Sequence, residues 1–86
     1  MEITDIKVIG NRGANAGKVF TPHKTKSGTY IVTKTRFQKD YVYVHTADEI
    51  IENVKAGLGV RMSAAGGPAS LFSADRIKKE NPAIFG

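Results

Sequence analysis

Cysteine is absent from this 86-residue chain. Its absence excludes disulfide bonds, zinc sites built on thiolates and cysteine nucleophiles. A chain of this size without such cross-links depends for its stability on a modest hydrophobic core or on self-association. The composition is otherwise that of an ordinary globular protein, with 41% hydrophobic and 24% charged residues. We therefore expect residues 1–86 to form one folded domain rather than a disordered chain.

Long apolar runs are also missing. No stretch approaches the roughly 20 consecutive apolar residues that a membrane-spanning helix needs. The first residues, Met1 to Asp5, lack the positive charge and the apolar segment of a secretion signal. We expect a cytoplasmic protein that does not contact a membrane, and the lack of cysteine is compatible with a reducing compartment.

Acidic residues are absent between Ile6 and Lys39. Together with Glu2 and Asp5, the first 39 residues carry a charge of +6, and the rest of the chain carries −1, which gives the net charge of +5. A field of this kind attracts polyanions or acidic protein surfaces and speeds their encounter. Eight basic residues occupy the acid-free segment: Lys7, Arg12, Lys18, Lys24, Lys26, Lys34, Arg36 and Lys39.

The sequence lacks the common motifs of enzymes and metal sites. The glycine-rich segment 10–18 does not have the spacing of a nucleotide-binding P-loop, since Val19 follows Lys18 where Ser or Thr is required. A weaker role remains open, in which its glycine N–H groups, Arg12 and Lys18 contact a backbone phosphate. His23 and His45 have no further ligands at metal spacing, and the Gly-x-Ser-x-Gly motif of hydrolases is missing. We expect neither catalysis nor a metal nor a cofactor.

The residue pattern predicts an α+β fold: a mainly antiparallel sheet of four to five strands, one amphipathic helix packed on it and a short C-terminal helix. A capping box of Thr46 and Glu49 starts the main helix, which we expect over residues 47–56 and which Gly57 closes. Ser73 caps the short helix, which runs to about Lys79. We expect flexible loops near 10–18 and 63–70, and a tail over 82–86 whose Ile84 and Phe85 could fold back on the core. The expected strands are residues 2–9, 18–21, 29–36, 41–45 and 60–63.

Two registers of the central hairpin are compatible with the sequence. A connection with an even number of residues places Lys34 opposite Tyr43 and Arg36 opposite Tyr41, which makes one face both cationic and aromatic. In both registers the two tyrosines point away from the neighbouring valines. Because these valines are the natural core residues, we expect at least one tyrosine to be exposed. A connection with an odd number of residues and a bulge instead gives a core face of Tyr30, Val32, Val42 and Val44, with Lys34 and Arg36 at its end. The opposite face then carries Ile31, Thr33, Tyr41, Tyr43 and His45.

Our first hypothesis is a small, basic, non-enzymatic protein that binds nucleic acid through this hairpin, with a preference for single-stranded DNA or RNA. Cations neutralise phosphates, and aromatic faces stack on bases of any sequence. Lys34 and Arg36 would contact phosphate, and Tyr41 and Tyr43 would stack on bases. Four further lysines would extend the positive field: Lys18, Lys24, Lys26 and Lys39.

The second hypothesis is a protein-interaction module, either an adaptor or an inhibitor. It would dock on an acidic protein surface through the same hairpin, or add an edge strand to a partner's sheet. Aromatic residues in strands and lysines at sheet edges also occur for reasons of packing and solubility alone. A homodimer formed through the exposed strand edge is compatible with either hypothesis.

Overall fold

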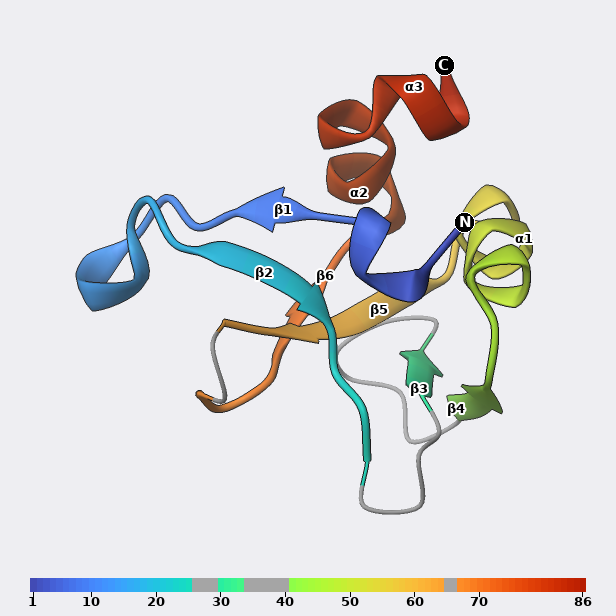
Figure 1. Cartoon of the computed structure of the whole chain (residues 1–86), viewed down its shortest axis with the longest axis horizontal. Coiled ribbons are helices and arrows are strands. Elements are labelled where there is room, and N and C mark those ends of the chain that lie inside the picture. The colour runs from blue at the N-terminus through green and yellow to red at the C-terminus, as the bar shows by residue number, and fades with distance from the viewer. Residues whose placement is uncertain (26–29, 34–40, 65–66) are drawn as a thin grey trace.

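Strand β5, Gly59–Ser63, is the centre of the fold. The computed structural model describes residues 1–25, 30–33, 41–64 and 67–86, and in this part of the chain six strands form one curled, antiparallel sheet (Figure 1). The strand order is β1-β2-β5-β3-β4, and β6 pairs with β5 outside this path. The other strands are β1 Val8–Ile9, β2 Val19–Pro22, β3 Tyr30–Thr33, β4 Tyr41–Val44 and β6 Ser70–Phe72.

Strands β2 and β3 pair with the same edge of β5, one after the other. Thr21 pairs with Ser63 at one end of β5, and Val32 pairs with Val60 at the other. Strand β6 occupies the opposite edge, where Phe72 also pairs with Val60. Since all three neighbours run antiparallel to β5, β2 and β3 run in the same direction.

The helices confirm the predicted α+β class. Helix α1 spans Ala47–Lys55, α2 spans Ala74–Glu80 and α3 spans Pro82–Phe85. The apolar stripe of α1 is placed as the helical spacing predicts, with Ala47, Ile50 and Val54 buried. Figure 1 shows the three helices grouped on one side of the sheet, and α1 packs against β5, α2 and α3.

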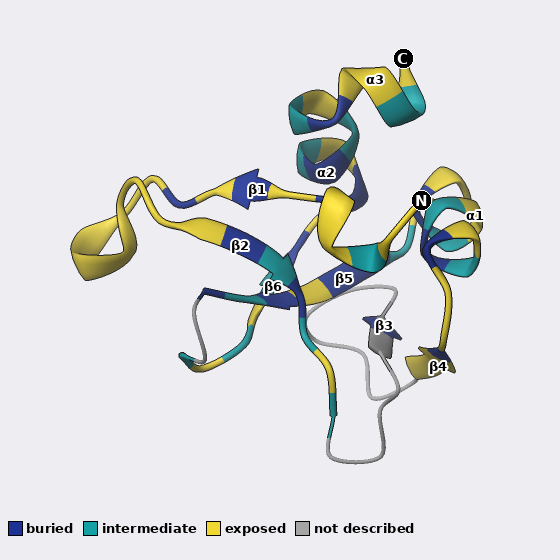
Figure 2. Cartoon of the chain, in the orientation of Figure 1, coloured by how far each residue is buried: buried dark blue, intermediate teal, exposed yellow. Residues whose placement is uncertain are grey.

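The hydrophobic core lies between the helices and the sheet (Figure 2). Phe20 of β2 meets Phe72 of β6 edge-to-face, with 5.1 Å between ring centroids. The largest side chains that are almost fully buried come from both layers: Ile6, Val8, Val32, Val44, Ile50, Val54, Val60, Met62 and Ile77.

The start of α1 follows the predicted capping box only in part. The Thr46 hydroxyl accepts a hydrogen bond from the Glu49 N–H at 3.2 Å, as expected. The Glu49 carboxylate, however, accepts from the His45 N–H at 3.4 Å and from the Thr46 hydroxyl at 3.2 Å, not from the Thr46 N–H. Gly57 closes the helix with φ +93°, a conformation that favours glycine. Ser73 caps α2 as predicted, with its hydroxyl accepting from the Arg76 N–H.

Three segments differ from the sequence-based expectation. Residues 2–9 are not one strand: Ile3–Asp5 forms a 3₁₀ turn, in which the Asp5 carboxylate accepts from the Glu2 N–H at 2.9 Å, and only Val8–Ile9 pairs. The expected loop 63–70 is shorter, since β5 extends through Ser63 and β6 begins at Ser70. The expected tail is helix α3, for which Pro82 at the first position suits the fixed φ of proline. Ile84 and Phe85 do pack against the core.

Candidate functional site

Tyr41 and Tyr43 form an exposed pair on one face of β4, and we call them the tyrosine pair. Tyr41 lies opposite Thr33 and Tyr43 opposite Ile31, which is the register that the odd-numbered connection predicts. The even-numbered alternative, which places Lys34 opposite Tyr43 and Arg36 opposite Tyr41 on one cationic and aromatic face, is therefore wrong. Their side chains are 53% and 46% exposed, and the rings meet edge-to-face with 5.0 Å between centroids. The sequence predicts that at least one of the two tyrosines is exposed, and the structure shows that both are.

The two tyrosine side chains also interact through their polar ends. The pKa of Tyr43 is raised above its ordinary value of 10.0, first by a side-chain hydrogen bond with Tyr41, then by partial desolvation and by the charge of Tyr41. The hydrogen bond favours the protonated form of Tyr43. The two rings thus form one exposed surface that carries both apolar ring atoms and polar hydroxyl groups.

Val42 corrects one expectation about this strand. It shares the core face with its partner Val32, which is fully buried, and yet Val42 is 50% exposed. Val44, at the other end of the strand, is buried as predicted. Helix α1 packs on β5 and on the other helices, so the core ends at Val44 and does not extend over the rest of β4. Residues 41–43 thus expose apolar surface on both faces of the strand.

The predicted basic residues are only partly placed. Lys18 and Lys24 are exposed. Lys18 directly precedes β2, which pairs with the Ser63 end of β5, whereas β3, the partner of β4, pairs with the Gly59 end. Lys18 therefore does not join the tyrosine pair. Four predicted contact residues lie outside the described residues: Lys26, Lys34, Arg36 and Lys39.

The glycine-rich loop uses its own backbone groups. The Gly10 N–H donates to the Lys18 carbonyl and the Gly17 N–H to the Gly10 carbonyl, both at 2.8 Å. The Lys18 N–H donates to the Asn15 carbonyl at 3.1 Å. Because these amides are already bonded inside the β1–β2 hairpin, they are not free to bind a phosphate. Of the groups that we expected to contact a backbone phosphate, the exposed cations Arg12 and Lys18 are still available.

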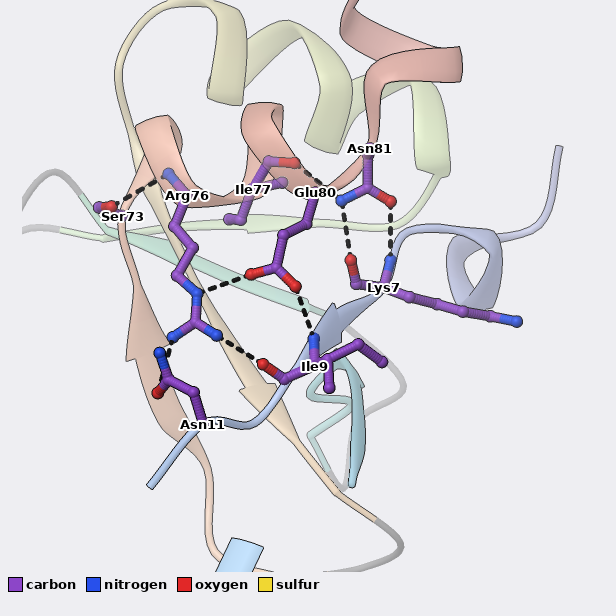
Figure 3. A network of polar contacts seen from close by, with 8 residues as sticks. All are labelled: Lys7, Ile9, Asn11, Ser73, Arg76, Ile77, Glu80 and Asn81. Atoms are coloured by element: carbon purple, nitrogen blue, oxygen red, sulfur yellow. Dashed lines mark hydrogen bonds and ion pairs between the residues drawn. The ribbon is translucent and has the colours of Figure 1, made fainter. Parts of the chain in front are cut away.

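Side chains of α2 and its C-cap cover the outer edge of β1 (Figure 3). The buried Asn81 accepts a hydrogen bond from the Lys7 N–H at 3.0 Å and donates to the Lys7 carbonyl at 2.8 Å. Glu80 accepts from the Ile9 N–H at 2.9 Å, and Arg76 donates to the Ile9 carbonyl. An ion pair of 2.7 Å between Arg76 Nε and Glu80 joins the two helix residues. This edge cannot pair with another strand, because its outward groups already have partners.

The opposite end of the strand path has no such cover in the described part of the chain. Strand β4 pairs with β3 alone among the described strands, and no side chain of the described residues bonds to the backbone of residues 41–43. The two ends of the sheet therefore differ: β1 is closed by polar side chains, and β4 presents backbone and apolar side chains together.

A groove of about 1120 Å³ lies between the β1–β2 hairpin, β6 and the first turn of α2. Arg12, Arg61 and Arg76 line it, and sequence reasoning did not group them, because they come from three distant segments. The one feature of the sequence that points toward this groove is the alternating pattern of β5, which places Arg61 on its outer face.

Other kinds of site are not supported by the described residues. They contain no cluster of three or more His, Cys, Asp or Glu side chains that could hold a metal ion. None of the described helices is long and apolar enough to cross a membrane. Comparison of the chain with protein-family models, with curated proteins and with solved structures gave no match.

Proposed function

We propose that this protein is a non-enzymatic nucleic-acid-binding protein that prefers single strands and stacks bases on the tyrosine pair. The observation that supports the proposal is the exposure of Tyr41 and Tyr43 on one face of β4, in contact with each other. Large aromatic side chains stabilise a small domain most when they are buried. Two of them at 53% and 46% exposure leave apolar ring surface that a base can cover.

Charge supports the same ligand class. The segment that joins β3 to β4, residues 34–40, contains Lys34, Arg36 and Lys39 against the single acid Asp40. In the proposal, Lys34 and Arg36 contact phosphates next to the stacked bases, and Lys18, Lys24, Lys26 and Lys39 strengthen the attractive field.

The test is fluorescence anisotropy of labelled single-stranded DNA, single-stranded RNA and duplex DNA. Stacking contributes about 1–3 kcal/mol per base, so the Tyr41→Ala/Tyr43→Ala variant should bind single strands at least about fivefold more weakly. The Tyr41→Phe/Tyr43→Phe variant keeps both rings and should bind within about twofold of the original protein, since stacking needs only the π-face. Unchanged affinity in the alanine variant, or stronger binding to duplex than to single strands, would contradict the proposal.

The edge of β4 favours a second candidate function, the protein-interaction module. An extended acidic segment of a partner could add to β4 as a further strand, which would pair its free backbone groups and cover Val42. The contrast with the covered β1 edge is the specific observation that favours this function. A second copy of the chain could use the same edge, and sedimentation velocity at several concentrations would detect such a dimer.

One substitution separates the two functions. Val42→Gln places a polar, uncharged side chain on the face of β4 opposite the tyrosine pair, where it opposes burial by an added strand, leaves the net charge unchanged and leaves both rings in place. If nucleic-acid binding is the function, this variant should keep its affinity for single strands. The interaction module is instead supported by two results together. The original protein binds no nucleic acid even at low salt, and it forms a nuclease-resistant complex with a protein partner that the variant does not form.

A further inference from the structure

The groove beside the β1–β2 hairpin carries two guanidinium groups that the fold does not use. Arg12 lies in the hairpin loop and Arg61 on β5, and both are exposed. Neither side chain has a hydrogen bond or an ion pair with any described residue. The third arginine of the groove, Arg76, has a different status, since it donates to Ile9, Asn11 and Glu80 and lies 5.2 Å from the Phe72 ring centroid.

The groove is shaped by rigid parts of the fold. Phe20 and Phe72 line it, are buried and meet edge-to-face. Gly10 also lines it, and a Cβ at this position would lie 2.2 Å from the Asn15 carbonyl oxygen and 2.8 Å from the Phe20 ring. The hairpin that bears Arg12 is therefore packed closely against the core. Arg76 anchors the same hairpin from the other side, through Ile9 and Asn11 (Figure 3).

The polar lining suits an anion with several oxygens. Arg12 and Arg61 can each donate two parallel hydrogen bonds, a geometry that matches phosphate. Ser70 and Asn15 line the same groove and can donate further hydrogen bonds. Asp75 is the acidic side chain in the lining, and Glu80 neutralises Arg76, so the two unpaired arginines outweigh the one carboxylate.

We infer that this groove binds the phosphate group of a nucleotide, with Arg12 and Arg61 as the two ligand-binding cations. The site is separate from the tyrosine pair and does not depend on the function proposed for it. The phosphate could belong to a free mononucleotide or to the 5′ end of a strand, and both present the same terminal phosphate dianion to the guanidinium groups.

The experiment is a titration of the ¹⁵N-labelled full chain, followed by amide chemical shifts. The ligands are AMP, inorganic phosphate, and a short oligothymidine with and without a 5′-phosphate. We expect AMP to shift the amides of Asn11, Asn15, Arg61 and Leu71. Binding of the oligonucleotide at these amides only when it carries the 5′-phosphate would identify a strand end as the source, and binding of AMP alone would identify a free nucleotide. Absence of shifts at the groove with every ligand would overturn the inference.

Three variants make the test specific. Arg12→Gln/Arg61→Gln should weaken AMP binding about tenfold or more, as expected for the loss of charged hydrogen bonds. Lys55→Gln/Lys79→Gln removes the same charge from exposed helix positions and should change it less than about twofold. An equal loss in the two variants would show a general charge effect and overturn the site.

Tyr41→Ala/Tyr43→Ala should leave AMP binding intact even if it abolishes the binding of single strands. This variant therefore separates failure of this inference from failure of the proposed function.

Discussion

The stability of the folded protein depends on pH through the carboxylate of Glu80, which binds the edge of the sheet. Its pKa is lowered from the ordinary value of 4.5, first by the hydrogen bond from the Ile9 N–H and further by Arg76, while partial burial opposes the change. A lowered pKa means that the folded state favours the ionised form. The contribution to stability is therefore present above pH 4.5 and is lost as the pH falls through the folded-state pKa.

We predict that Glu80→Gln lowers the free energy of unfolding by about 1–2 kcal/mol at pH 7, because two charge-assisted hydrogen bonds become weaker or repulsive. The difference from the original protein should shrink as the pH falls below 4.5, where both side chains become neutral. Urea denaturation at a series of pH values measures this. Glu52→Gln, at an exposed position on α1, is the matched control and should show no such pH-dependent difference. A constant difference at every pH would mean that the charge of Glu80 has no role.

At the scale of elements, the parts that could be predicted are those determined by near neighbours in sequence. Thr46 and Ser73 cap helices through the N–H group three residues later, and the apolar spacing of α1 fixes its buried face. The pairing of Val32 with Val42 belongs to one of the two registers that the sequence left open, so the local pattern narrowed the register without choosing it. Each of these features rests on rules of local geometry that one stretch of sequence contains.

The features that could not be predicted join distant parts of the chain. Asn81 contacts the backbone of Lys7, 74 residues away, and its sequence context with Pro82 indicates only the end of a helix. Strand β6 has three residues and no alternating pattern long enough to recognise. Arg12, in the loop of the β1–β2 hairpin, and Arg61, on β5, line the same groove although they lie far apart in the sequence. For the same reason the exposure of Val42 could not be foreseen, since it depends on where α1 is placed.

Gly10 tests the packing of the β1–β2 hairpin. Gly10→Ala would place a methyl group 2.2 Å from a backbone oxygen, so the hairpin must shift. We predict a loss of about 1–3 kcal/mol in the free energy of unfolding, as for other overpacked sites. Gly13→Ala is the control: it meets no atom within 4 Å, although its φ of +57° costs about 1 kcal/mol. Equal losses in the two variants, measured by thermal and urea denaturation, would show that the contact at Gly10 is not tight.

At the scale of the whole molecule, the sheet has two unlike ends and an uneven charge. Residues 1–39, which include β1, β2 and β3, carry a charge of +6, and the rest of the chain, which includes α1, α2 and α3, carries −1. The polar cover on β1 prevents association at that edge, and net positive charge opposes association between copies elsewhere. A ligand that combines negative charge with flat apolar groups would be attracted by the positive charge and could cover the exposed side chains of β4. Single-stranded nucleic acid combines these two properties.

Charge placement rather than total charge should determine binding. Lys34→Glu/Arg36→Glu and Lys55→Glu/Lys79→Glu each lower the net charge from +5 to +1, so the long-range field falls by a similar amount in both. If Lys34 and Arg36 contact phosphates, the first variant loses two released counterions, and the slope of log K against log salt should flatten by about 1.4 for single-stranded DNA. The second variant should keep the slope of the original protein and lose affinity only at low salt, where screening is weak. Anisotropy titrations at four or five salt concentrations measure both slopes. Equal flattening in the two variants would mean that the chain attracts nucleic acid through its general field, and that the hairpin makes no phosphate contacts of its own.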